Sequence, residues 1–150
     1  MNQKFFLFIA TGAGCGYFPK APGTAGSVAG ILLYFLLIGL PPALYLAFTL
    51  LLALVGVHAA RIAESHFNKK DPKEVVIDEI AGMLLSLFLV PPEPLPLLAG
   101  FLLFRLLDIA KPGLRRLEKM EGGWGIMLDD VAAGIMANGM LHGTMAILNL

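Results

Sequence analysis

The sequence predicts an all-α fold, a small helical bundle that crosses a lipid bilayer several times. Hydrophobic residues make up 57% of the 150 residues, charged residues only 15%, and the mean hydropathy is +0.78, all outside the averages of soluble domains. No residue is charged between 21 and 60 or between 131 and 150. Because roughly 20 helical residues cross the hydrocarbon layer, the first run suffices for two crossings and the second for one.

Prolines divide the apolar runs into helices. Pro41 and Pro42 interrupt the first run and predict a helical hairpin, because proline ends one helix and can begin the next. A third apolar stretch, 80–104, is split by the prolines of 91–96 and predicts a second hairpin, whose first arm is only about 16 Å long. A C-terminal helix follows the two hairpins. At this length, residues 1–150 are expected to form a single domain. The predicted spans are residues 26–40, 42–60, 80–90, 95–107 and 131–150.

The positions of lysine and arginine predict the orientation of these spans. All 11 lie in the N-terminal stretch, between 61 and 73, or between 105 and 119, and neither proline-rich turn contains one. With the predicted spans, the three basic regions share one side of the membrane, which the positive-inside rule assigns to the cytoplasm. We therefore expect a multi-pass protein of a cytoplasmic membrane, with no nucleic-acid partner.

Five acidic residues stand at the ends of the predicted spans on this same side. One acid at a helix N-terminus is ordinary capping, but two adjacent pairs would repel each other unless a cation lay between them. A set of oxygen ligands suits a hard cation such as Mg²⁺. The pattern therefore predicts a divalent metal site. The five residues are Asp78, Glu79, Asp108, Asp129 and Asp130.

Two glycines predict how the acids come together. Gly82 follows Asp78 by four positions, and Gly134 follows Asp130 by four, so each glycine lies one helical turn along the same face as its acid. Small residues let membrane helices approach closely, so we expect these two helices to pack directly beneath the acids. Glycines that merely face lipid are the alternative.

Candidate phosphate-binding groups flank the acids. Arg105 and Lys111 stand three residues before and after Asp108, and both side chains bind phosphate well. The glycine-rich stretches 16–27 and 121–127 can turn backbone N–H groups and hydroxyls toward an anion. A basic cluster that holds anionic lipid, and flexible connectors, are the alternatives. The candidates from the two stretches are Thr24, Ser27, Gly122 and Gly123.

Metal, phosphate-binding groups and a lipid setting together predict phosphoryl chemistry on a lipid. Ala21, not arginine, stands six positions after Cys15, which excludes a cysteine-phosphatase loop, and no serine occupies a nucleophile elbow. We therefore expect attack by water, assisted by Mg²⁺, with a carboxylate that accepts the proton.

Four segments resemble the signature blocks of the phosphatidylglycerophosphatase A family, in its order and spacing. They are APGTAGS at 21–27, IDEIAGM at 77–83, FRLLDIAKP at 104–112 and GGWGIMLDD at 122–130. The resemblance implies a Mg²⁺-dependent enzyme of the bacterial inner membrane that hydrolyses phosphatidylglycerol phosphate to phosphatidylglycerol and inorganic phosphate on the cytoplasmic side. It matches the five acids and Lys111 to the family's functional residues. Our hypothesis assigns the metal to Asp78, Glu79, Asp129 and Asp130, one of which also serves as the base.

Two other classes of protein fit part of this pattern. In a small transporter or ion-binding subunit, the same acids would carry a cation, although such acids are expected at mid-membrane rather than at helix ends. In a soluble all-α metal-dependent phosphohydrolase, the apolar helices would form the core. Solubility without detergent would distinguish the soluble phosphohydrolase from a membrane enzyme. Phosphate release from a lipid would distinguish the membrane enzyme from a transporter.

Overall fold

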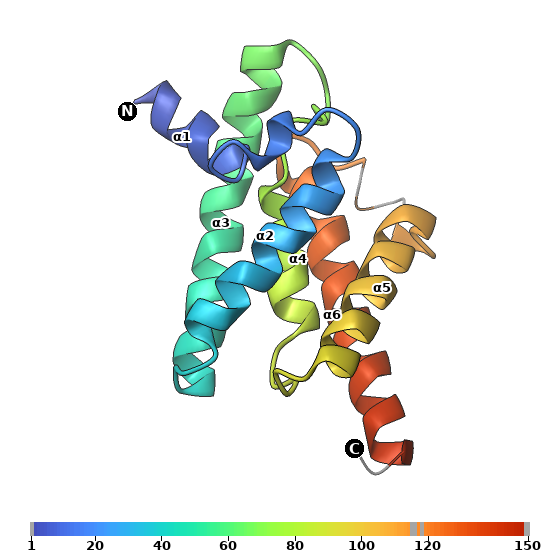
Figure 1. Ribbon diagram of the computed structural model, residues 1–150. Coiled ribbons are helices and arrows are strands. Elements are labelled where there is room, and N and C mark those ends of the chain that lie inside the picture. The colour runs from blue at the N-terminus through green and yellow to red at the C-terminus, as the bar shows by residue number, and fades with distance from the viewer. Residues whose placement is uncertain (1, 115–116, 118, 149–150) are drawn as a thin grey trace.

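The computed structural model describes residues 2–114, 117 and 119–148, and within them every regular element is a helix. This confirms the predicted all-α class. Figure 1 shows the helices as a bundle, with the C-terminal part of the last one extending beyond the others. The elements are α1 (Gln3–Ala10), the 3₁₀ turn η1 (Cys15–Tyr17), α2 (Pro22–Leu37), α3 (Pro42–Phe67), α4 (Ile77–Ser86), α5 (Pro94–Ala110) and α6 (Trp124–Leu148).

Local sequence signals explain where several helices begin and end. Pro22, Pro42 and Pro94 each occupy the first turn of a helix, where proline costs no hydrogen bond. Asn68 ends α3 and Lys111 ends α5, both in the left-handed conformation that commonly stops a helix. The proline-based hairpin boundaries therefore correspond to helix boundaries in the structure.

Most helix boundaries differ from the sequence-based spans by several residues: α2 covers Pro22–Leu37 rather than 26–40, and α3 ends at Phe67 rather than at 60. α4 ends at Ser86, although residues 80–90 were predicted as one segment, and α6 begins at Trp124 rather than at 131. Apolar side chains continue past Ser86, so hydropathy could not reveal the end of α4. The last two residues of the span 131–150 lie outside the described residues. Of the described helices, α3 and α6 are long and apolar enough to cross a membrane, and α2 is a shorter apolar helix.

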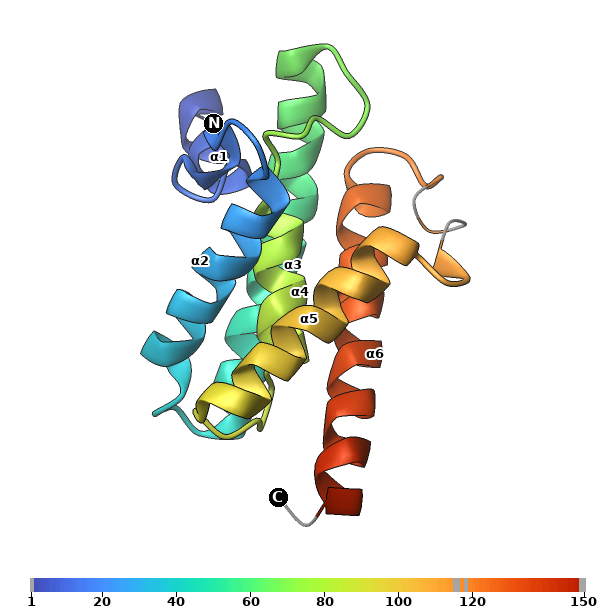
Figure 2. The ribbon, with the colours of Figure 1, turned by 45° about the vertical axis from the view of Figure 1, so that its right-hand side comes forward.

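The short helix α4 lies at the centre of the bundle. It packs against α2, α3, α5 and α6, and nearly all of its residues are buried. Figure 2 shows α5 running obliquely across α4 and α6. By contrast, the outer faces of the surrounding helices expose large apolar side chains, as expected for a surface in contact with lipid. Examples are Leu32 and Leu36 of α2, Leu51 and Leu54 of α3, and Leu102 and Leu106 of α5.

Side chains from three helices bind the backbone where α4 ends. Carbonyl groups at a helix end need partners, because an unpaired carbonyl in an apolar interior costs free energy. Here tyrosine hydroxyls and an asparagine amide donate to them, which fixes α4 along the bundle. The bonds are Tyr34 Oη to the Val90 carbonyl at 2.7 Å, Tyr45 Oη to Leu84 at 2.8 Å, and Asn138 Nδ2 to Ser86 at 3.0 Å and Phe88 at 2.8 Å.

The predicted close approach of two glycines is confirmed. A Cβ atom added to Gly134 of α6 would collide with the carbonyl group of Gly82 in α4. A Cβ added to Gly82 would lie 2.7 Å from the Asp130 carbonyl oxygen and 2.5 Å from the Phe104 ring. The backbones of α4 and α6 therefore touch here, one turn below the acids, which brings the acidic ends of both helices together.

Candidate active site

The five predicted acids line one cavity of about 800 Å³ at the N-terminal end of α4. Asp78 and Glu79 lie in the first turn of α4, Asp108 near the end of α5, and Asp129 and Asp130 in the second turn of α6. Helix capping does not explain Asp78, because the N-cap of α4 is Val76 and no side chain caps it. The sequence-based prediction that the acids converge therefore agrees with the geometry.

Three of these carboxylates form a compact group. One oxygen each of Asp78, Glu79 and Asp130 lies within 4.8 Å of the others. Asp78 and Asp130 are buried, with only 7% and 2% of their surface exposed. Asp78 Oδ1, Glu79 Oε2 and Asp130 Oδ2 are buried and have no hydrogen-bond partner within the described part of the chain. Buried charges without partners are strongly destabilising, so this donor set fits a hard divalent cation among the three oxygens.

The electrostatics of the α4 acids agree with this interpretation. Burial raises the pKa of Asp78 well above its ordinary value, and the negative charges of Glu79 and Asp130 raise it further. Burial also raises the pKa of Glu79, while Asp78 and the nearby Arg105 guanidinium act in the opposite direction. Desolvation thus disfavours the charged form of both groups, and a bound cation would favour it.

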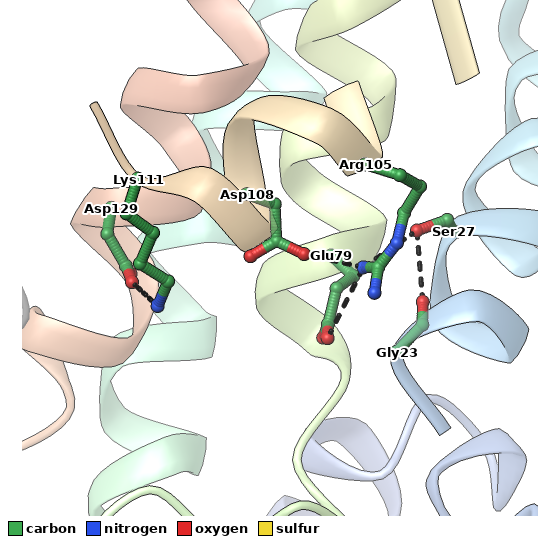
Figure 3. A network of polar contacts seen from close by, with 7 residues as sticks. All are labelled: Gly23, Ser27, Glu79, Arg105, Asp108, Lys111 and Asp129. Carbon is green, nitrogen blue, oxygen red and sulfur yellow. Dashed lines mark hydrogen bonds and ion pairs between the residues drawn. The ribbon is translucent and has the colours of Figure 1, made fainter. Parts of the chain in front are cut away.

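Asp129 takes part in a different contact from the other predicted metal ligands. Its Oδ2 atom accepts a hydrogen bond from Lys111 Nζ at 2.5 Å, in an ion pair between α6 and the end of α5 (Figure 3). It is therefore not part of the compact three-carboxylate group. Its other oxygen, Oδ1, is buried and has no partner among the described residues. A role for Asp129 in metal binding stays a prediction.

Arg105 lies at the centre of a second polar network, which joins α5 to α4 and α2. Its Nη1 atom lies 2.7 Å from Asp108 Oδ2 and 3.8 Å from Glu79 Oε1. The same atom donates to Ser27 Oγ at 3.4 Å, and Ser27 Oγ donates to the Gly23 carbonyl at 2.9 Å (Figure 3). These contacts hold the guanidinium beside the acids, where it lines the cavity together with Lys111.

The predicted phosphate-binding residues of the two glycine-rich stretches divide into two groups. Thr24 and Gly123 line the cavity, whereas Ser27 and Gly122 are not among its lining residues. Ser27 is fully buried and contacts Arg105, so in this structure it orients the guanidinium. Gly123 has a φ of +85°, a conformation that favours glycine, and it packs so closely against the α3 backbone at Val57 that a Cβ atom would not fit.

Sequence reasoning missed several residues that the loops bring to the cavity. Lys70 and Lys73, from the α3–α4 loop, and Lys119, from the α5–α6 loop, line its outer part. Irregular loops have no periodicity that would predict which side chains face inward. Gly23 was also missed: a Cβ there would collide with the Glu79 carboxylate and crowd Arg105. Its position directly after the helix-starting Pro22 was the available signal.

Comparisons with known proteins agree on one family. Residues 8–145 match the family model described as phosphatidylglycerophosphatase A. Phosphatidylglycerophosphatase A of Escherichia coli is 36% identical to this chain, over 95% of this chain and 84% of its own length. Phosphatidylglycerophosphatase A of Haemophilus influenzae is 39% identical, over 86% of this chain and 82% of its own length. A Bacteroides thetaiotaomicron protein provisionally named phosphatidylinositol-3-phosphatase is 39% identical, over 90% of this chain and 91% of its own length. No solved structure matches. The chain belongs to the phosphatidylglycerophosphatase A family and is a phosphatase.

Proposed function

We propose that this protein is a Mg²⁺-dependent lipid phosphatase that converts phosphatidylglycerol phosphate to phosphatidylglycerol and inorganic phosphate in phospholipid biosynthesis. The observation that carries the proposal is the compact group of three carboxylates, Asp78, Glu79 and Asp130. Each has a buried oxygen without a partner among the described residues, and the cavity that they line also holds the cations Arg105 and Lys111. The family and the names of two relatives support the substrate.

The residues of the site have separate roles in this proposal. Asp78, Glu79 and Asp130 hold the metal, with Asp129 as a further candidate ligand. A bound divalent cation would offset the negative charge of the phosphate and lower the pKa of the attacking water. Lys111 and Arg105 bind the phosphate oxygens, and their ion pairs with Asp129 and Asp108 orient them. Of the predicted donors, Thr24 and Gly123 line the cavity and complete the phosphate environment, whereas Ser27 orients Arg105 and Gly122 does not line the cavity.

The reaction needs one nucleophile, one base and one leaving group. Water attacks the phosphorus atom of the terminal phosphate, and one of the cavity carboxylates accepts its proton. The bond between phosphorus and the glycerol oxygen breaks, and this oxygen takes up a proton to become the free hydroxyl of phosphatidylglycerol. Burial of the acids limits access of bulk water, which strengthens their electrostatic interactions with the reacting groups.

We propose a multi-pass arrangement in the bacterial inner membrane, with the site on the cytoplasmic side. Support comes from the length and apolar character of α3 and α6, and from the exposed apolar faces of the outer helices. The basic loops lie at the same end of the bundle as the acids, and the positive-inside rule assigns that end to the cytoplasm. A lipid substrate would then reach the site from the inner leaflet.

A second candidate substrate is phosphatidylinositol 3-phosphate, which the provisional name of the Bacteroides relative suggests. This lipid, like phosphatidylglycerol phosphate, carries a phosphomonoester on a polyol head group. The cavity of about 800 Å³ lies in the range of sites for such large head groups. The two lipids are therefore compared directly in the assay that follows.

Phosphate release by purified protein in neutral detergent micelles tests the proposed function. We expect phosphate release from phosphatidylglycerol phosphate that EDTA abolishes and excess Mg²⁺ restores. The reason is that the three carboxylates cannot position the substrate phosphate without a bound cation. Phosphatidylinositol 3-phosphate is assayed in parallel, and a higher kcat/KM for it would favour the second candidate. Release that persists in EDTA would contradict the metal role, and cation uptake into vesicles without any phosphate release would favour a transporter.

A further inference from the structure

The outer part of the cavity carries three lysines that the proposed chemistry does not use. Lys70 and Lys73 belong to the α3–α4 loop and Lys119 to the α5–α6 loop, so they come from two loops that are distant in sequence. We call them the rim lysines. All three are exposed to solvent, in contrast to the buried acids deeper in the cavity.

The rim lysines differ from the inner cations in their partners. Arg105 and Lys111 are each held by a carboxylate, Asp108 and Asp129 respectively. Within residues 2–114, 117 and 119–148, no ion pair engages any rim lysine. Their ammonium groups are thus available to an anion that enters the cavity.

The charge distribution favours a second anion at the rim rather than deeper inside. In the interior, five carboxylates face the two cations Arg105 and Lys111. Of the other acids that line the cavity among the described residues, Glu64 belongs to the end of α3 and Asp71 to the α3–α4 loop that carries Lys70 and Lys73. The Glu64 carboxylate accepts a hydrogen bond from the Asp71 backbone N–H at 3.4 Å. The interior therefore needs a metal ion before it can hold any phosphate, whereas the rim attracts an anion unaided.

The size of the cavity also exceeds what one phosphate needs. A volume of about 800 Å³ is typical of sites for much larger ligands. The lipids that the names of the relatives specify carry two phosphates, a terminal phosphomonoester and a phosphodiester that joins the polyol to the diacylglycerol. The inner groups account for the phosphomonoester alone, which leaves the phosphodiester without an assigned partner.

We propose that the rim lysines Lys70, Lys73 and Lys119 bind the phosphodiester of the substrate while the inner groups hold its terminal phosphate. The inference rests on the proposed function and deepens it. The substrate class is a lipid with a phosphomonoester on a polyol head group that a phosphodiester links to the lipid. A lipid such as phosphatidic acid, with one phosphate only, fills the inner site and leaves the rim lysines unused.

Product inhibition separates the two subsites, because each product carries one of the two phosphate groups. Phosphatidylglycerol retains the phosphodiester, and inorganic phosphate corresponds to the terminal group. Phosphate release is measured in neutral detergent micelles for the wild type and for a variant that combines Lys70→Gln, Lys73→Gln and Lys119→Gln. We expect the inhibition constant for phosphatidylglycerol to rise by about tenfold or more, since each lysine near an anionic head group contributes favourably. That for inorganic phosphate should stay within about twofold.

Two controls make the result specific. Lys69→Gln removes an exposed lysine of the same loop that does not line the cavity, and it should change neither constant. Oleate, an anionic lipid that carries no phosphodiester, should affect the wild type and the triple variant alike. A parallel loss for oleate would mean that the lysines attract any anionic lipid. An unchanged constant for phosphatidylglycerol would mean that they do not bind the phosphodiester. Either result overturns the inference. A wild type without Mg²⁺-dependent release would instead refute the proposed function itself.

Discussion

Replacement of Asp130 by asparagine is expected to lower Mg²⁺-dependent phosphate release by about a thousandfold, the upper range for loss of one group that stabilises transition-state charge. Asp130 is 2% exposed, and one of its carboxylate oxygens lies within 4.8 Å of one oxygen each of Asp78 and Glu79. Asparagine keeps the shape of the side chain but removes the charge that a metal ion needs. The measurement is kcat/KM for phosphatidylglycerol phosphate at saturating Mg²⁺.

The loss in Asp130→Asn should not come from unfolding. The substitution removes a buried charge that has no hydrogen-bond partner for Oδ2 within the described residues, so the melting temperature without Mg²⁺ should equal or exceed that of the wild type. Mg²⁺ should raise the melting temperature of the wild type more than that of the variant. Glu93→Gln, in the turn before α5 and far from the cavity in sequence, is the control. A variant with full activity would remove Asp130 from the site.

Replacement of Gly134 by alanine is expected to destabilise the protein and to impair the site at once. The added Cβ would collide with the Gly82 carbonyl group, so α4 and α6 would have to separate. Overpacking of this kind costs about 1–3 kcal/mol. Because the proposed metal ligands come from both helices, the separation should also lower the affinity for Mg²⁺. Thermal unfolding and the Mg²⁺ dependence of phosphate release measure the two effects.

Gly143→Ala, in the same helix, provides the matched control. A Cβ at Gly143 would meet no atom within 4 Å, and alanine favours a helix more than glycine by about 1 kcal/mol. This variant should therefore be at least as stable as the wild type and equally active. If Gly134→Ala behaved in the same way, the close contact between α4 and α6 would not be what holds the acids together.

The sequence was sufficient to predict the helical class, the starts of α3 and α5, and the convergence of the acids. These features depend on patterns that are local in the chain: apolar runs, prolines at helix starts, and a glycine one turn after an acid. The predicted contact between Gly82 and Gly134 is confirmed. It could be predicted because the spacing of residues along a helix determines which face each residue occupies. The number of membrane crossings stays a prediction.

Features that depend on tertiary distance could not be predicted in the same way. Asp129 and Asp130 are neighbours in sequence, but consecutive helical residues point about 100° apart, so Asp130 faces α4 and Asp129 meets Lys111. The end of α4 at Ser86 depends on side chains of other helices, such as Tyr34 and Asn138, that donate to backbone carbonyl groups at Ser86 and beyond it. Loop residues such as Lys70 carry no periodic signal at all.

Binding of Mn²⁺, as a paramagnetic substitute for Mg²⁺, most directly tests whether the three carboxylates share a cation. The purified protein is titrated with Mn²⁺, and electron paramagnetic resonance measures the free ion. We expect saturable Mn²⁺ binding that Mg²⁺ competes away. Asp78→Asn and Asp130→Asn should each weaken this binding by about tenfold or more, and Glu93→Gln should leave it unchanged. Absence of saturable binding, or equal affinity in wild type and Asp130→Asn, would contradict a metal centre formed by α4 and α6.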